Sequence, residues 1–247
     1  MNFRLLIPLT LFSASLLAQP LKLATAPAGN AREGAALQAE LLAQRPGNST
    51  ISAVLKTRDD SGNRTEIPVT LETKIIDATR WEATYQTTPS DAKLREKLTV
   101  IHQHQQPNAY RWSRAESTNE MALTGEKIFT AFAGTDFFAG DLGLEFLHWP
   151  QQIVLKHEMK RSRPCKVLES KNPAPTGPAY ARVVSWVDTE TGGLLRAEAY
   201  NARDQLVKEF SVRSFKKVEG HWELKEMEIL NPQADTRTRL EFNLTVP

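Results

Sequence analysis

Apolar and polar residues alternate along most of this chain with a period of two. Such alternation places successive side chains on opposite faces of a β-strand, so it indicates strands with one apolar and one polar face. The clearest case lies near the C-terminus, where every second residue from Leu240 to Val246 is apolar. The pattern therefore predicts a mainly β protein whose sheet is antiparallel, with one face buried and the other in water.

The alternating segments are separated by short runs rich in Gly, Asn and Asp, which are typical of turns. The run from Asp59 to Asn63 joins the first two segments and predicts a β-hairpin. Because the later connections are also short, we expect successive strands to pair as neighbours in a meander. The predicted strands are 51–58, 64–71, 80–87, 98–105, 108–113, 151–158, 165–170, 180–188, 194–200, 207–215, 221–230 and 236–246.

Two segments depart from this alternation. Residues 31–44 carry leucines at helical spacing among Glu, Gln and Ala, and Pro46-Gly47 ends the predicted amphipathic helix. Between Glu126 and Pro150, apolar residues run together on a backbone interrupted by glycines. We expect Asp136 and Asp141 to act structurally here, with Asp141 capping a short helix that carries the apolar residues up to Leu147.

The N-terminal residues have the pattern of a secretory signal peptide over 1–18. Arg4 supplies the charged region, and the apolar run that follows is shorter than the roughly 20 residues of a membrane-spanning helix. We expect cleavage after Ala18, an extended lead segment at 19–30, and a single domain at 31–247. No cysteine lies near this cleavage point, which argues against an acylated lipoprotein N-terminus.

The charge balance and the cysteine content exclude some classes of partner and of covalent stabilisation. The chain has 31 Lys and Arg against 29 Asp and Glu, a balance that argues against nucleic acid as a partner. A local basic cluster, Lys156 to Lys166, either binds a phosphate headgroup or an acidic partner, or it protects a charged sheet edge from aggregation. Cys165 is the only cysteine, so no intramolecular disulfide can form and the core must stabilise the fold.

Known catalytic and metal-binding motifs are absent from the sequence. His157-Glu158 begins the zinc-protease pattern, but Arg161 occupies the position of its second histidine. His102 and His104 would share one face of a strand, yet no third ligand can be placed, and a polar strand face is the preferred interpretation. We expect no enzyme activity, no metal and no cofactor.

The most suggestive chemical feature is a set of aromatic residues, many of them within the segment where alternation fails. We predict that they line an apolar ligand cavity and its lid, with an ordinary hydrophobic core as the alternative. The set comprises Trp81, Tyr85, Trp112, Phe129, Phe132, Phe137, Phe138, Phe146 and Trp149.

Several stretches in the second half of the chain resemble the outer-membrane lipoprotein-sorting family, whose members have a LolA-like fold. The similarity extends over that half by residue type and spacing, and over the first half by the order of the elements. The stretches are Gly134-Thr135-Asp136-Phe137, Asp141-Leu142, Val187-Asp188, 194–200, 206–208, 215–222, 227–229, Asn231 and 236–238.

The resemblance implies a strongly curved antiparallel sheet that forms an unclosed barrel, covered by a few helices. It further implies that the helix at 31–44 and the segment 129–149 form the cover, with an apolar cavity beneath them. Proteins of this family carry lipoprotein acyl chains from an inner-membrane transporter to an outer-membrane acceptor. The later stretches have the form of a divergent branch of the family, so a free lipid or glycolipid is an alternative cargo.

The sequence thus predicts a periplasmic carrier that binds lipid or lipoprotein acyl chains in an apolar cavity and moves them toward the outer membrane. An envelope structural or sensor module with the same fold is the second hypothesis. A hydrolase is the third, although no set of nucleophile, base and orienting residue can be named for it.

Overall fold

The structure is a computed structural model that describes residues 29–91, 93, 95–114, 119–218 and 221–244. The predicted signal peptide at 1–18 and all but the last two residues of the predicted lead segment at 19–30 lie outside the described residues.

Strands dominate the described part of the chain, as the alternation predicts. The first half contains helix α1 (Ala31–Leu42) and strands β1 (Ser49–Arg58), β2 (Arg64–Ile75), β3 (Arg80–Thr87), β4 (Glu96–Gln103), β5 (Ala109–Arg114) and β6 (Met121–Leu123). The second half contains β7 (Gln151–Lys160), β8 (Arg163–Lys171), β9 (Arg182–Asp188), β10 (Leu194–Tyr200), β11 (Leu206–Val218), β12 (His221–Asn231) and β13 (Thr236–Phe242).

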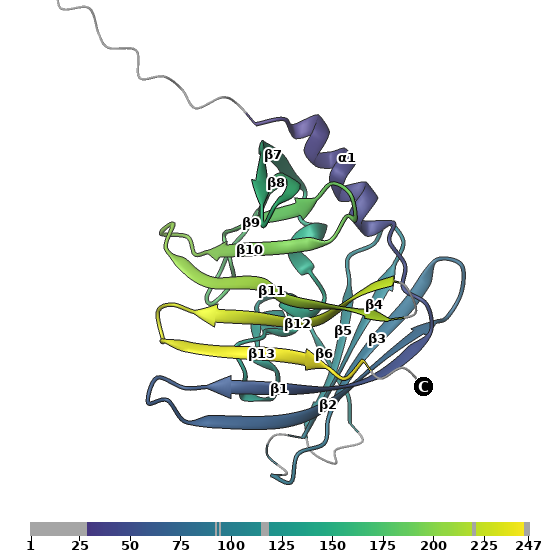
Figure 1. The fold of residues 1–247 in the computed structure, drawn as a ribbon, viewed down its shortest axis with the longest axis vertical. Coiled ribbons are helices and arrows are strands. Elements are labelled where there is room, and N and C mark those ends of the chain that lie inside the picture. The colour runs from purple at the N-terminus through teal and green to yellow at the C-terminus, as the bar shows by residue number, and fades with distance from the viewer. Residues whose placement is uncertain (1–28, 92, 94, 115–118, 219–220, 245–247) are drawn as a thin grey trace, which may run out of the picture.

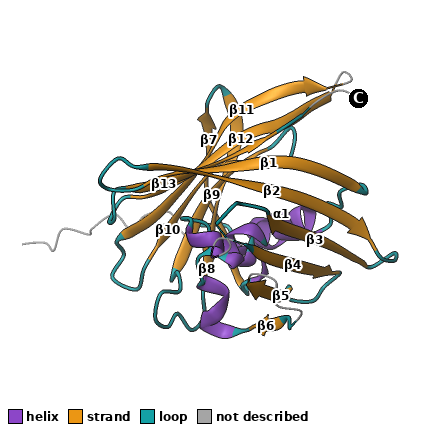
Figure 2. Cartoon of the chain, turned by 90° about the horizontal axis from the view of Figure 1, so that it is seen from below, coloured by secondary structure: helices purple, strands orange, loops and turns teal. Residues whose placement is uncertain are grey.

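All the described strands belong to one sheet in the order β6-β5-β4-β3-β2-β1-β13-β12-β11-β10-β9-β8-β7, and all its pairings are antiparallel (Figure 1). It consists of two meanders, β1 to β6 and β7 to β13, joined where β1 pairs with β13 and Leu55 lies opposite Leu240. The sheet curves strongly, and β6 and β7 stand at its two ends (Figure 2). The predicted unclosed antiparallel sheet is therefore confirmed.

The expectation that successive strands pair as a meander is confirmed for the strands joined by short connections, such as β9 to β12, and fails only between β6 and β7, which are the two ends of the sheet. The chain between them, which we call the crossover (residues 124–150), runs inside the curve of the sheet (Figure 2). The crossover contains η2 (Gly125–Phe129), η3 (Phe132–Gly134), α2 (Ala139–Leu142) and η4 (Glu145–His148).

The crossover supplies large side chains to the core. Phe132 and Phe137 are each 2% exposed and pack with Leu98 of β4 and Leu240 of β13, so one segment joins the two halves of the sheet. A second cluster, which includes Phe146, Trp149 and Tyr180, lies under β7 to β10 and helix α1. In these two clusters, the apolar faces of the strands thus pack against the crossover rather than against a second sheet.

The helix expected to run from Asp141 to Leu147 is interrupted. Helix α2 ends at Leu142, and Leu144 has a φ of 50°, in the left-handed region that ends a helix. Asp141 does act at the N-terminus of α2, where its Oδ2 accepts a hydrogen bond from the backbone N–H of Phe138. Asp141 thus has the structural role expected of it at a helix N-terminus, but it does so as the third residue of a single-turn helix whose N-cap is Phe138, and not as the cap of a helix that continues to Leu147.

Helix α1 begins as predicted and lies against the edge strand β7. Its N-cap residue Asn30 accepts a hydrogen bond from the backbone N–H of Glu33, and its backbone pairs with Val154 of β7. Gln38 donates from Nε2 to the carbonyl oxygens of Leu147 and Trp149, which fixes α1 to the crossover. Within the described ranges, no helix combines the length and the apolar character needed to cross a membrane.

Helix α1 approaches β7 closely at Gly34, and a substitution at this position tests the packing between them. A Cβ atom at position 34 would lie 2.2 Å from the carbonyl oxygen of Gln152, whereas a Cβ at Gly47 would meet nothing within 4 Å. Replacing a helical glycine by alanine normally stabilises a helix by about 1 kcal/mol. We expect Gly34→Ala instead to lower the free energy of unfolding by about 1–3 kcal/mol, because overpacking displaces α1.

Urea denaturation of Gly34→Ala beside Gly47→Ala measures this difference, and the control should stay within about 0.5 kcal/mol of the parent protein. A Gly34→Ala protein as stable as the parent would show that α1 is not held in this close contact.

Candidate functional site

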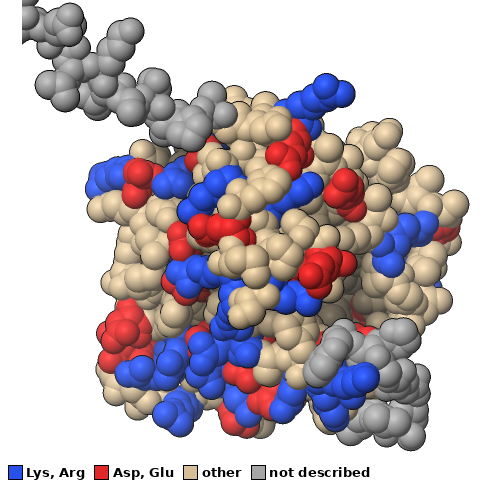
Figure 3. All heavy atoms as spheres, turned by 45° about the horizontal axis from the view of Figure 1, so that its top comes forward, with Lys and Arg blue, Asp and Glu red and all other residues tan. Residues whose placement is uncertain are grey.

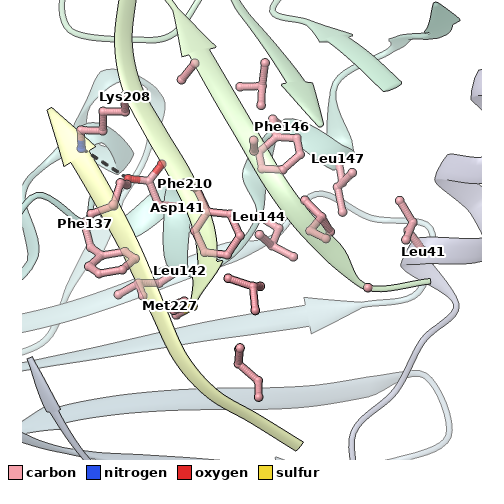
Figure 4. Close-up of a pocket in the computed structure, with 18 of the residues that line it drawn as sticks. Leu41, Phe137, Asp141, Leu142, Leu144, Phe146, Leu147, Lys208, Phe210 and Met227 are labelled. Atoms are coloured by element: carbon pink, nitrogen blue, oxygen red, sulfur yellow. Dashed lines mark hydrogen bonds and ion pairs between the residues drawn. The ribbon is translucent and has the colours of Figure 1, made fainter. Parts of the chain in front are cut away.

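A cavity of about 360 Å³ lies between the crossover and the second half of the sheet (Figure 4). We call it the β9–β12 cavity, after the strands that form its sheet wall. Ala197 and Ala199 are two residues apart on β10, so both side chains point to the same face, and their small size leaves open space there. The other wall is formed by crossover side chains, among them Phe137 and Phe146.

A larger cavity of about 770 Å³ lies beneath the first half of the sheet, and we call it the β2–β4 cavity. Its wall contains Trp81 of β3, His102 of β4 and His148 of the crossover. The segment that follows helix α1, Ala43 to Pro46, also contributes to it. This cavity is richer in polar side chains than the β9–β12 cavity.

The two cavities adjoin. Six residues line both of them, namely Leu41, Gln44, Tyr85, Leu142, Leu144 and Leu147. Three of the six are leucines of the crossover, so the crossover forms the partition between the cavities. Burial raises the pKa of the Tyr85 hydroxyl to about 12, and this group stays neutral at physiological pH.

One wall of the β9–β12 cavity holds a buried polar cluster of Asp141, Lys208 and Tyr180. The Tyr180 hydroxyl donates to Asp141 Oδ1 at 2.9 Å, and Lys208 Nζ lies 3.4 Å from Asp141 Oδ2 (Figure 4). Lys208 Nζ also donates to the backbone carbonyl of Asp136 and lies 3.0 Å from the centre of the Phe138 ring. Burial lowers the pKa of Lys208, and the nearby Asp141 and Asp136 oppose that shift.

Asp136 lies beside this cluster and has the structural role expected of it. Its carboxylate accepts hydrogen bonds from the hydroxyls of Thr236 and Thr238, both on β13. These bonds attach the crossover to the strand that joins the two halves of the sheet.

An aromatic stack of Trp81 and His102 lies in the wall of the β2–β4 cavity, with ring centroids 3.7 Å apart. Burial lowers the pKa of His102 to about 4, and His148 acts in the same direction, while a hydrogen bond with Asn108 opposes them. Burial also lowers the pKa of His148. Both imidazoles are therefore neutral at physiological pH and act there as hydrogen-bonding groups.

The nine aromatic residues expected to form the cavity and lid divide into two groups. Trp81, Tyr85, Phe137 and Phe146 line one or both cavities. The other five pack elsewhere among the described residues: Phe132 lies in the central core, Phe129 and Trp149 lie under helix α1, Phe138 stacks on Tyr180, and Trp112 donates from Nε1 to Glu96. Ligand binding by any of the nine stays a prediction.

The other side chains considered from the sequence are placed as follows. Cys165 is free and buried, and burial raises the pKa of its thiol, which disfavours the reactive thiolate. His104 lies beyond the end of β4, and the described residues contain no group of three or more potential metal ligands. In the basic cluster, Lys156, Arg163 and Lys166 form ion pairs with acidic residues. Basic and acidic side chains are interspersed on the face shown in Figure 3.

Sequence reasoning missed Lys208, Tyr180 and the segment Ala43 to Pro46. A signal for Lys208 exists in the strand pattern, because it shares its parity along β11 with Phe210 and Val212, which both line the β9–β12 cavity. A lysine at an inward-facing position needs a buried partner, and Asp141 is that partner. Nothing local in the sequence indicates Tyr180, since its hydroxyl meets Asp141 only after folding.

The fold and this site can be compared with known proteins. A family model described only as an uncharacterized protein matches residues 80–246, which is more than half of the chain. No curated protein matches the chain in sequence.

Solved structures match the fold over most of the chain. A DUF1329 family protein from Desulfovibrio piger has a TM-score of 0.73 at 19% identity, with 87% of this chain and 92% of that chain covered. A putative outer membrane lipoprotein-sorting protein domain from Vibrio parahaemolyticus has a TM-score of 0.70 at 18% identity, with the same coverage. A LolA superfamily protein from Nitrosomonas europaea has a TM-score of 0.61 at 13% identity, with 87% and 91% covered.

The Asp141–Lys208 pair gives a stability test. Their side chains are 14% and 5% exposed, so Asp141→Asn would leave a buried ammonium without its carboxylate. We expect a loss of about 3–5 kcal/mol in the free energy of unfolding, more than the roughly 1 kcal/mol of a lost helix cap. Adding Lys208→Met should restore part of this loss, as measured by urea denaturation of both single variants and the double variant. Strictly additive effects would show that the two groups do not interact.

The lowered pKa of His102 predicts how the free energy of unfolding depends on pH. Its folded pKa of about 4 lies below its ordinary value of 6.5, so the unfolded chain takes up the proton first as the pH falls. The contribution of the neutral imidazole to the free energy of unfolding is therefore fully present above pH 6.5. It is lost as the pH falls from 6.5 to about 4, at up to about 1.4 kcal/mol per pH unit.

Denaturation curves across this range should fall less steeply for His102→Gln than for the parent protein. His104→Gln, at an exposed position two residues away, is the matched control and should follow the parent. Equal slopes for all three proteins would argue against a buried, neutral His102.

Proposed function

Because the chain belongs to the family whose model matches residues 80–246 and has the LolA-like fold of outer-membrane lipoprotein-sorting proteins, we propose that it is a carrier of lipid or lipoprotein acyl chains. The acyl chain lies in the β9–β12 cavity and is covered by the crossover. The single observation that carries this proposal is an apolar cavity of about 360 Å³ inside the curve of the sheet.

Two properties of this cavity suit an acyl chain. Its walls are mostly Leu, Val, Ala, Ile, Met and Phe, from which an alkyl chain gains about 0.8 kcal/mol for each buried CH₂ group. The small side chains of Ala197 and Ala199 leave the space open, whereas a core that only stabilises the fold is packed without voids. The cavity therefore has both the surface and the room that an apolar ligand requires.

The proposed role is non-catalytic. The ionisable groups in the wall of the β9–β12 cavity are Asp141, Lys208, Tyr85 and Tyr180. Three of them bind one another, and burial raises the pKa of both tyrosine hydroxyls, so each stays protonated. Groups that are paired or protonated in this way can orient a bound ligand, but they offer no free nucleophile or general base for a reaction with it.

On this proposal the protein acts in the periplasm, since residues 1–18 have the pattern of an export signal. An inner-membrane transporter would supply the cargo and an outer-membrane acceptor would take it. The fold similarity to a lipoprotein-sorting domain supports these partners.

Ala197→Phe tests the proposal, because the phenyl ring would occupy the space assigned to the acyl chain. We expect the variant to lose at least about ten-fold in affinity for a fluorescent fatty acid, corresponding to about 1.4 kcal/mol, while it stays folded, since filling a cavity is often stabilising. Ala234→Phe adds the same ring at an exposed turn and should bind like the parent protein.

Mass spectrometry of organic extracts from the purified parent protein should also detect lipid, at a lower level in Ala197→Phe. Unchanged binding by a folded Ala197→Phe protein would show that the ligand does not occupy the β9–β12 cavity. A parent protein that neither binds the fatty acid nor copurifies lipid would exclude the carrier function.

A further inference from the structure

The β2–β4 cavity differs in charge from its neighbour. None of the described residues that line it is Asp or Glu, whereas its wall includes Arg45 and three histidines, His102, His104 and His148. The β9–β12 cavity, in contrast, is lined by one acidic and one basic residue, Asp141 and Lys208, which pair with each other. Of these two cavities, the β2–β4 cavity is the one whose wall has a cationic side chain and no acidic side chain, so it is the better environment for a negatively charged group.

Arg45 is that cationic side chain. Its guanidinium donates to the backbone carbonyl oxygens of Asp77, at 2.7 Å, and Ala78, which fixes the side chain in the wall of the cavity. Both acceptor atoms are backbone carbonyls, and the carboxylate of Asp77 forms its ion pair with Arg80; among the described residues no ion pair involves Arg45. Because a guanidinium has five N–H donors, some remain for a ligand.

The other polar groups of this cavity are hydrogen-bonding groups without a negative charge. Burial keeps the imidazoles of His102 and His148 neutral. The indole of Trp81 is stacked against His102, and this pair forms a flat apolar platform beside the polar groups. The wall thus combines a cation, neutral donors and an aromatic surface, which suits the polar end of an amphiphile.

Leu144 connects this polar region with the acyl cavity. It lines both cavities and is 39% exposed, so its side chain is accessible from the space that the two cavities share. Its backbone has a φ of 50°, a conformation that costs a non-glycine residue roughly 1–2 kcal/mol and that often marks a functional position. An alkyl chain that passes from one cavity to the other would cover this side chain.

We propose that the two cavities form one site for an anionic amphiphile. This proposal rests on the proposed function. The acyl chain occupies the β9–β12 cavity, its first carbons pass over Leu144, and the anionic headgroup lies in the β2–β4 cavity beside Arg45. The site thus selects a lipid whose head is a carboxylate or a phosphate over one with a cationic head.

The test compares three probes with the same alkyl chain and different heads: palmitate, hexadecanol and hexadecyltrimethylammonium. Each displaces a fluorescent fatty acid from the full protein, below its micellar concentration and at low salt. We expect palmitate to bind at least about ten-fold more tightly than the cationic probe, with hexadecanol between them.

Arg45→Gln should abolish the preference for palmitate and leave hexadecanol binding unchanged. Arg45→Lys keeps the charge and should retain much of the preference. The double variant Asp141→Asn with Lys208→Met removes the charges of the β9–β12 cavity without leaving either partner alone, and it should keep the preference. Arg45 is exposed, so its variants are expected to fold, and a thermal melt checks each protein.

Equal affinities for palmitate and the cationic probe would overturn the headgroup proposal and leave the carrier function standing. A preference lost in the double variant but kept in Arg45→Gln would overturn it as well, because the head would then lie beside Lys208. Failure of all three probes to bind would instead contradict the proposed function itself. A phosphate-headed lipid that binds more tightly than palmitate would support the proposal and show that the site prefers a phosphate to a carboxylate.

Discussion

The apolar concave face of a sheet that does not close has to be covered, and the rest of the structure depends on how this is done. One segment, the crossover, covers it by running from the edge strand β6 to the opposite edge strand β7. Phe132 and Phe137 fill the centre, where they contact strands of both halves. Because one chain segment cannot fill the whole concave volume, space remains on both sides of it, and the two cavities are that space.

The same segment stabilises the fold and forms the walls of the site, so the two roles are divided among its residues. Phe132, Asp136 and Asp141 attach the crossover to the sheet through burial, hydroxyl hydrogen bonds and a charged pair. Leu142, Leu144 and Leu147 line both cavities. Cavity size can therefore differ between related chains through the second group alone, without loss of the attachments made by the first.

Strands and helix α1 could be predicted from the sequence because periodicity is a local signal: 80–87 and 194–200 match β3 and β10 to the residue. The three-residue β6 is too short to show a period. Only a resemblance to known proteins predicted the curvature. The aromatic residues were a partial guide to the cavities, since aromatic character does not distinguish Phe146, which lines one, from Phe132, which lies in the central core. Long-range contacts such as that between Asp141 and Lys208 leave no local pattern.

The pairing of β1 with β13 has a consequence for how the protein reaches this structure. Leu55 and Leu240 are partners across that pairing, so β1 pairs with β2, its neighbour in sequence, and with β13, the last of the described strands. Pairing over such a sequence separation is slow, because a long loop must close before any contact is gained. Until β13 arrives, β1 is an unprotected strand edge with an apolar face, open to pairing with other chains. A chain of this topology is therefore exposed to pairing between copies through β1 for as long as β13 has not yet taken its place beside it.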